Sequence, residues 1–373
     1  MAENKDKKVL NVPALRFPEF TEEWVNVSLK DVADFQKERI SSGLLDESTY
    51  ISTENILQNF QGVQSAISIP ANTNVVAYKK NDILLSNIRP YLKKVWFSDK
   101  IGGCSADVFV LRSKTCEPKF LYNVIASDKF INYVMSGAKG VKMPRGDKNQ
   151  MESFSFSIPA VAEQRKISRL FQLLDEKIAT QNKIIEKLQS LIKGIAQHCI
   201  KESTSGNTYV KLGDICQITT GKLDANAQVD NGIYPFFTCA EQPFKINSFA
   251  FDTEALLISG NGANLGYINY YKGKFNAYQR TYVLDLFSEN IQYIKWALKV
   301  LLPKRIAIEK SSSNTPYIVL STLTDLRLPI PCKSKQSFIA NLMQSLERKL
   351  SNQIAQYDSY NYLKQYLLRQ MFI

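Results

Sequence analysis

The chain has 373 residues, of which 45% are hydrophobic and 22% charged, as expected for a globular protein with two or more domains. Its net charge of +12 favours polyanionic partners through long-range attraction and counterion release. The N-terminal segment is polar, and no apolar run approaches the roughly 18–20 residues of a membrane-spanning helix. We therefore expect neither a secretory signal nor a membrane segment.

The residues that usually carry catalysis or bind metals are scarce. The six cysteines are scattered and contain no Cys-x-x-Cys pair, which argues against zinc and disulfides and indicates a reducing cytoplasm. The single histidine, His198, excludes a His-rich metal site, and no phosphate-binding loop of the Walker type is present. The sequence contains no catalytic constellation.

The chain repeats itself. The segment VSLKDV at 27–32 recurs as VKLGDI at 210–215, which lies 183 residues later. The segment SIP at 157–159 recurs as PIP at 329–331, only 172 residues later, so the second copy is 11 residues shorter. A period of this length indicates two tandem domains rather than a solenoid, and two similar domains suggest a two-part target.

The first globular domain is predicted at 12–159. It mixes β-prone runs at 82–86 and 108–111 with an amphipathic helix at 120–134, which indicates an α+β fold. Its predicted loops carry the first set of candidate DNA contacts: Lys79, Lys80, Arg89, Tyr91, Lys93, Lys94, Lys139, Lys142, Arg145 and Lys148. Lysines suit phosphates, whereas arginine and amide side chains can recognise base edges. For any single lysine, a solvated surface position is the simpler interpretation.

Residues 160–203 are predicted to form the first long helix. Apolar residues recur there at alternating spacings of four and three, which is the coiled-coil period. The predicted seam includes Ile167, Leu174, Gln181, Leu188 and Ile195. About 37 helical residues would make a rod about 55 Å long.

The second globular domain is predicted at 208–331, with β-prone runs at 255–259 and 281–284 and a helix at 290–302. Its candidate DNA contacts, also in predicted loops, are Asn261, Asn264, Tyr267, Tyr278, Arg280, Lys304, Arg305, Lys310, Ser311, Ser312, Ser313 and Asn314. The loops at 137–148 and 310–317 occupy the same place in both copies, and for these two we favour DNA contact. The glycine cluster at 260–266 precedes an aromatic, β-prone stretch rather than a helix, so a tight loop between strands is predicted instead of a cofactor site.

Residues 332–373 are predicted to form the second long helix, whose seam includes Ile339, Leu346, Gln353 and Leu367. An antiparallel pair of helices, related by an approximate two-fold axis, would set Gln181 opposite Gln353. A buried polar pair would penalise shifted registers. The alternative is that both glutamines lie at the edge of the seam and contact water.

Three segments resemble the specificity (S) subunits of Type I restriction–modification systems. They are LRFPEF at 15–20 followed by Glu23 and Trp24, the IP-x-x-x-EQ-x-x-I pattern at 158–167, and LKQYLLRQMF at 363–372. The second copy departs from the pattern with Lys335 before Gln336, where the family has Glu-Gln, and this departure bears on the capping of the second helix.

The resemblance implies two target recognition domains, each recognising one half of a bipartite double-stranded DNA sequence. It implies that the long helices set the spacer between the halves and dock two methyltransferase (M) subunits, and that two restriction (R) subunits can join. S-adenosylmethionine would then bind in the M subunits, and ATP and Mg in the R subunits, which leaves this chain a non-catalytic, cytoplasmic subunit in phage defence by restriction and DNA methylation.

Two alternatives stay open. One is a fused adenine-N6 DNA methyltransferase that uses the glycine loop at 260–266, although the Asn/Asp-Pro-Pro-aromatic motif that would hold the flipped base is missing. The other is a structural coiled-coil adaptor whose positive charge is incidental.

Overall fold

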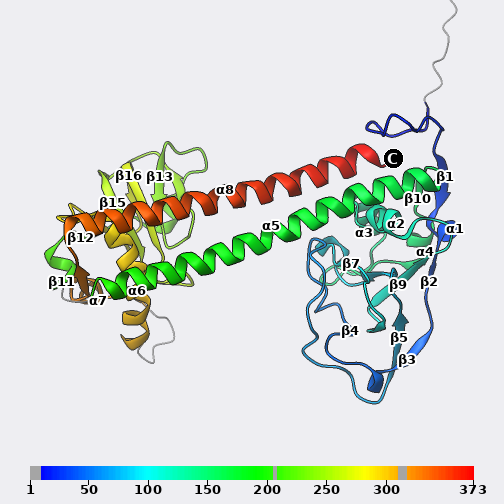
Figure 1. The fold of residues 1–373 in the computed structure, drawn as a ribbon, viewed down its shortest axis with the longest axis horizontal. Coiled ribbons are helices and arrows are strands. Elements are labelled where there is room, and N and C mark those ends of the chain that lie inside the picture. Colours follow the sequence, from blue (N-terminus) through cyan, green and yellow to red (C-terminus); the bar gives the residue numbers. More distant parts are fainter. Residues whose placement is uncertain (1–9, 205–207, 310–316) are drawn as a thin grey trace, which may run out of the picture. The chain divides into compact units, whose positions relative to one another are not determined.

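The computed structural model describes residues 10–204, 208–309 and 317–373. The chain divides into two units, one comprising 1–181 and 357–373 and the other 182–356. Each unit contains one globular domain and parts of the two long helices, α5 (Val161–Glu202) and α8 (Lys333–Met371), as Figure 1 shows.

Unit 1 contains a four-stranded sheet whose central strand β6 (Ile83–Ser86) is buried along its whole length. Its strand order is β2 (Ala33–Phe35), β9 (Val108–Ser113), β6, β7 (Val95–Phe97). A second sheet has the order β3 (Arg39–Ser41), β5 (Asn74–Tyr78), β8 (Gly102–Cys104), β4 (Tyr50–Ile51). Strand β1 (Val25–Ser28), which leads into α1 (Leu29–Val32), pairs antiparallel with β10 (Ser155–Ile158). The remaining helices are η1 (Ser42–Leu44), η2 (Pro90–Leu92), α2 (Pro118–Ile125), α3 (Asp128–Ser136) and α4 (Lys148–Glu152).

Unit 2 contains one six-stranded sheet. Its order is β12 (Gln217–Thr220), β17 (Thr281–Asp285), β15 (Phe251–Ser259), β16 (Ile268–Ala277), β13 (Tyr234–Phe237), β14 (Phe244–Ile246). Strand β11 (Thr208–Lys211) pairs antiparallel with β18 (Arg327–Ile330). The helices are η3 (Leu212–Asp214), η4 (Ala225–Ala227), α6 (Ile291–Glu309) and α7 (Leu320–Thr324).

The sequence repeat is a structural repeat. The order β2-β9-β6-β7 in unit 1 corresponds to β12-β17-β15-β16 in unit 2, and the pair β1-β10 corresponds to β11-β18. The amide of Leu29 donates to the carbonyl oxygen of Phe154 at 2.9 Å. The equivalent amide of Leu212 donates to the carbonyl oxygen of Leu326 at the same distance. The two copies therefore share a backbone framework.

The two long helices run antiparallel, because the beginning of one packs against the end of the other within each unit. In unit 1, Ile167 and Phe171 of α5 share a hydrophobic core with Leu368 and Met371 of α8. In unit 2, Leu188 and Ile192 share a core with Ile339 and Met343. The predicted fold class, with two similar α+β domains and a pair of long antiparallel helices, is confirmed.

The predicted seam positions face these packed surfaces to different degrees. Those whose side chains are buried are Ile167, Leu188 and Ile339, and those partly buried are Leu174, Ile195, Leu346 and Leu367. Gln181 is buried and Gln353 is half-buried. They fall in different units, and their mutual contact stays a prediction.

A buried glutamine fixes each globular domain to its own long helix. The Gln164 side chain accepts a hydrogen bond from the Glu117 amide and donates one to the Pro159 carbonyl, both at 2.8 Å. In unit 2, Gln336 accepts from the Asn290 amide at 3.0 Å and donates to the carbonyl oxygen before its own helix at 2.9 Å. The glutamine makes these bonds in both copies, so Lys335 in place of glutamate leaves them intact.

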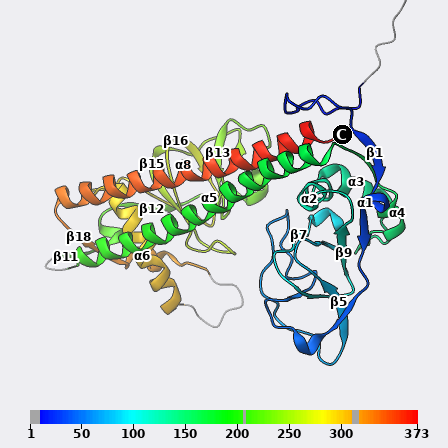
Figure 2. The same ribbon diagram turned by 45° about the vertical axis from the view of Figure 1, so that its right-hand side comes forward.

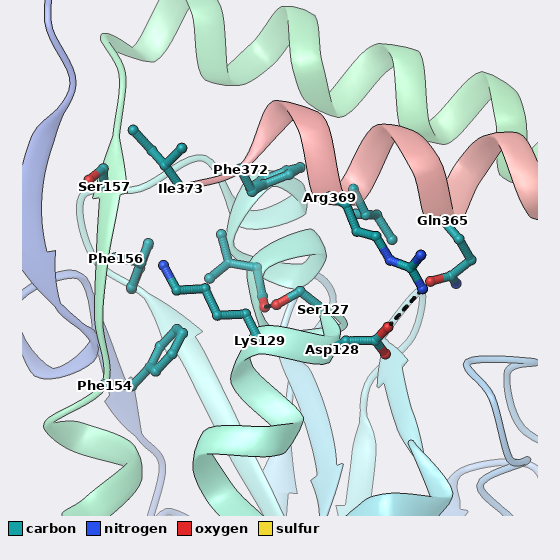
Figure 3. Close-up of a pocket in the computed structure, with 12 residues that line it drawn as sticks. Ser127, Asp128, Lys129, Phe154, Phe156, Ser157, Gln365, Arg369, Phe372 and Ile373 are labelled. Atoms are coloured by element: carbon teal, nitrogen blue, oxygen red, sulfur yellow. Dashed lines mark hydrogen bonds and ion pairs between the residues drawn. The ribbon is translucent and has the colours of Figure 1, made fainter. Parts of the chain in front are cut away.

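A pocket of about 200 Å³ lies where the end of α8 meets the first domain (Figure 3). Phe154, Phe156 and Phe372 form part of its apolar lining, and Arg369 faces Asp128 at 3.6 Å. Figure 2 shows α2 and α3 beside the beginning of α5 in the same unit. The end of α8 is thus part of the first domain's packing.

Two helix predictions were wrong in detail. The helix predicted at 120–134 is two helices, α2 and α3, because the chain turns at Ala126 and the Ser127 side chain then caps α3 by accepting from the Phe130 amide at 3.2 Å. The helix predicted to end at 302 continues through Pro303 to Glu309. Its first half is held by burial in the core, and this packing outweighs the hydrogen bond that a proline removes.

Candidate nucleic-acid interface

In unit 1 the structure joins two loops that lie far apart in the sequence. The loop after β6 contains Arg89, whose amide donates to the Pro144 carbonyl at 2.8 Å. The amide of Gly146 donates in turn to the Asn87 carbonyl at 3.1 Å. Most of the first set of candidate contacts therefore belongs to one surface, which we call the first loop pair (87–94 with 137–148).

Several cations of this loop pair already have carboxylate neighbours. Lys93 pairs with Asp128 at 2.5 Å, Arg145 with Asp107 at 2.9 Å, Lys139 with Asp147 at 3.0 Å, and Lys148, on α4 rather than in a loop, with Glu152 at 3.4 Å. These are exposed or half-exposed pairs, which contribute little to stability in water. A phosphate can therefore compete for such cations at small cost.

The other candidates of unit 1 have different surroundings. Lys142 and Tyr91 are exposed within the loop pair, whereas the ammonium group of Lys94 donates to the Thr53 carbonyl at 2.5 Å. Lys79 and Lys80 lie in the turn before β6, at the opposite end of that strand from Arg89. The structure does not bring these two lysines together with the first loop pair.

Unit 2 contains an equivalent surface built around the glycine cluster, which we call the second loop pair (260–267 with the described end of 310–317). The amide of Gly260 donates to the Arg280 carbonyl at 2.9 Å, and Ile318 donates to the Gly260 carbonyl at 2.8 Å. Asn261 forms an antiparallel bridge with Tyr317. These bonds bring Asn261 and Arg280 together with Tyr317, the described end of the loop at 310–317.

The two loop pairs have the same hydrogen-bonding plan. In unit 1 the Asn87 amide donates to the backbone carbonyl of Asp107 at 2.8 Å. This bond matches the one from the Gly260 amide to the Arg280 carbonyl. Two residues farther on, Arg89 and Gly262 both have positive φ, at 50° and 79°. A non-glycine residue seldom adopts this backbone conformation, so the equivalent geometry in both copies shows that the loop shape is retained.

Cys239 contacts the second loop pair, and sequence reasoning missed this contact. Its thiol donates to Oδ1 of Asn261 at 3.0 Å, and its carbonyl accepts from Nδ2 of Asn264 at 3.0 Å. The cysteine thus orients both asparagines. A scattered cysteine carries no pattern in the sequence that could reveal this contact.

The remaining candidates of unit 2 divide into three groups. Tyr267 is exposed and Tyr278 half-buried beside the same loop. Lys304 and Arg305 were predicted in a loop, but they lie on α6 because that helix passes Pro303, and Arg305 pairs with Glu309 at 2.5 Å. Lys310, Ser311, Ser312, Ser313 and Asn314 lie outside the described residues.

The glycine cluster itself is a tight connection between β15 and β16, as predicted, and it does not open a helix. It therefore lacks the helix N-terminus that a dinucleotide or S-adenosylmethionine loop uses to bind its anion. Among the described residues, no group of three or more His, Cys, Asp or Glu side chains could hold a metal ion. No helix in the described part of the chain is long and apolar enough to cross a membrane.

Comparison with known proteins agrees with this geometry. The family model of the Type I restriction modification DNA specificity domain matches the chain twice, at 21–190 and 204–357. The chain belongs to this family, as a specificity subunit with two target recognition domains.

Two curated relatives and two solved structures show the extent of the similarity. The chain is 44% identical to the Type I restriction enzyme EcoDI specificity subunit of Escherichia coli over 37% of its own length and 30% of the relative's. It is 22% identical to the MjaVIII specificity subunit of Methanocaldococcus jannaschii over 92% and 90%. The S subunit structure from M. genitalium matches with a TM-score of 0.67 at 18% identity, covering 97% of this chain and 99% of that one. A structure from work on assembly of the type I R-M system matches with a TM-score of 0.59 at 20% identity, covering 92% and 96%.

Proposed function

We propose that each target recognition domain recognises one half of a bipartite double-stranded DNA sequence through its loop pair. The observation that carries this proposal is the equivalence of the two loop pairs, which present Arg89 and Arg145 in one domain and Asn261 and Arg280 in the other. Arginine and asparagine side chains can make bidentate contacts with guanine and adenine edges. The lysines beside them suit the phosphate backbone.

The two long helices set the spacer between the half-sites and dock two methyltransferase subunits. Exposed apolar side chains on these helices support docking, among them Leu173 and Leu191 of α5 and Tyr362 and Tyr366 of α8. Exposed apolar side chains that gather into a patch mark protein–protein contact sites, whereas single ones are ordinary. Restriction subunits would join this core complex in the reducing cytoplasm, where the six free cysteines stay reduced.

The reactions belong to the partners. S-adenosylmethionine would bind in the methyltransferase subunits, and ATP and Mg in the restriction subunits. The chain itself contributes recognition and no catalysis. Its glycine loop has hairpin geometry. This geometry disfavours a fused methyltransferase.

A domain exchange tests the proposal. Residues 12–159 are replaced by the corresponding domain of a relative, the complex with methyltransferase is expressed, and methylated adenines are mapped in the host DNA. One half of the methylated sequence should change while the other half and the spacer stay the same. A change in both halves contradicts independent recognition by each domain.

Salt dependence distinguishes this function from a coiled-coil adaptor. Binding of the assembled complex to DNA should weaken steeply as salt rises, because each neutralised phosphate releases counterions. Absent or salt-insensitive DNA binding would favour the adaptor.

A further inference from the structure

The tip of the loop at 139–145 combines a hydrogen-bonded backbone with full exposure of an aliphatic side chain. The amide of Lys139 donates to the Arg145 carbonyl, and the amide of Arg145 donates back to the Lys139 carbonyl, each at 2.9 Å. This reciprocal pair closes a five-residue tip, which turns at Gly140 with φ of 95°. The bond from Arg89 to Pro144 anchors the tip to the rest of the first loop pair.

Val141 lies at this tip and is fully exposed, with a relative accessibility of 102%. A single exposed aliphatic residue is ordinary on a protein surface. Here, however, Met143 and Tyr91 of the same loop pair are also about half exposed. The tip therefore presents apolar groups to solvent from a backbone that two hydrogen bonds hold in place.

Cations flank the apolar tip on both sides in the sequence. Lys139 and Arg145 close the tip, with side chains 82% and 54% exposed, and Lys142 is exposed between the two apolar residues. Such a pattern suits DNA, because the cations can contact phosphates while a neutral side chain between them contacts the bases. A partner protein surface would need to supply carboxylates on both sides of an apolar contact.

We propose that Val141, supported by Met143, inserts between stacked bases in the half-site that the first domain recognises. This proposal rests on the DNA recognition proposed above. Apolar side chains that enter between base steps unstack them and bend the duplex, and the bend brings more protein surface into contact. The loop would thus recognise how easily the half-site deforms, in addition to the base edges near Arg89.

The test uses the full chain assembled with methyltransferase and a short duplex carrying the mapped target. 2-Aminopurine replaces one purine at a time in the first half-site, excluding the methylated adenine, and its fluorescence rises when a neighbouring base unstacks. We expect the fluorescence to rise at one base step with the unaltered complex. The rise should be absent with Val141→Ser and present with Val141→Leu. Val141→Ser should also weaken binding about tenfold, from the loss of one buried aliphatic side chain.

Ile67→Ser provides the matched control, because Ile67 is 88% exposed in another loop of the same unit. This control should leave fluorescence and affinity unchanged. Replacing thymines of the half-site by deoxyuridine separates insertion from contact with a thymine methyl group in the major groove. If the effect of Val141→Ser disappears on deoxyuridine DNA, the valine contacts a methyl group and the insertion is refuted.

The remaining outcomes are also decisive. Specific binding with no fluorescence rise at any step, or with a rise that Val141→Ser preserves, overturns the insertion but leaves the proposed function intact. Loss of assembly with methyltransferase in Val141→Ser would identify the tip as a protein contact and overturn the proposal. Absence of sequence-specific binding by the unaltered complex would overturn both.

Discussion

The buried glutamine at the beginning of each long helix should be a main attachment between that helix and its domain. Gln164 is 2% exposed and Gln336 is 1% exposed. Replacing Gln164 by alanine removes the partners of the Glu117 amide and the Pro159 carbonyl. The methyl group of alanine cannot reach either one, and water has little access to this position.

The magnitude follows from the two backbone groups that lose their partners. Each unsatisfied buried group costs roughly 1–3 kcal/mol, so Gln164→Ala should destabilise unit 1 by roughly 3 kcal/mol. For a unit of this size, such a loss lowers Tm by roughly 6–12 °C. Gln336→Ala should have a similar effect on unit 2, because it removes the equivalent pair of bonds around Asn290 and Pro331.

Thermal and urea unfolding of the full chain measure this effect. The chain has two units, so the curves are fitted with two transitions, and each variant should shift one of them. Gln189→Ala, at an exposed position of the same helix α5, is the control and should shift neither by more than about 0.5 kcal/mol. A loss below about 1 kcal/mol in both glutamine variants would refute the reasoning, because it would show that the backbone groups find other partners.

Inserting one heptad into each long helix should lengthen the unspecified spacer in the methylated sequence, and an unchanged spacer in methylation maps would contradict the role of the helices. Lys364 is buried and pairs with Asp175 at 2.6 Å. Asp175→Ala should therefore destabilise unit 1 by roughly 1–3 kcal/mol, as measured by urea unfolding. This value is below that of a fully buried pair because the Asp175 carboxylate is partly exposed. Replacing both residues by leucine should restore stability; a double variant as unstable as the single one would argue against the buried charge as the cause. A hydrogen bond with Ser334 lowers the pKa of the exposed Cys332, whereas burial raises the pKa of Cys104 and of Cys116 to about 12. Iodoacetamide at neutral pH should therefore label Cys332 well before the other two cysteines, as measured by peptide mass mapping. Equal labelling of the three cysteines would contradict the burial of Cys104 and Cys116 and the exposure of Cys332.

Much of the architecture could be predicted from the sequence because it depends on periodic patterns. The alternating spacing of Ile167, Leu174 and their successors identified the packed side of α5, since side chains three and four residues apart share one face of a helix. The repeated segments at 27–32 and 210–215 located equivalent strands and turns. The glycine cluster was correctly predicted as a hairpin because an aromatic, β-prone run follows it.

The errors arose where tertiary packing overrides local signals. Pro303 usually marks the end of a helix, but α6 continues because its first half is buried in the core of unit 2. Lys364 is a charged residue buried on α8 where the helix pattern would favour an apolar one, and its ion pair with Asp175 accounts for this. Neither partner could be identified from sequence spacing, because the two residues lie 189 positions apart.

The sequence by itself determined that this protein has two copies of an α+β domain, each followed by a long helix, since repetition and periodicity are properties of the chain. Only the tertiary structure decided which loops meet. The contacts between 87–89 and 144–146, and between 260–261 and 317–318, join segments that no local pattern connects. Hydrogen bonds between distant backbone groups form these surfaces, and a backbone group carries no signature in the side-chain sequence.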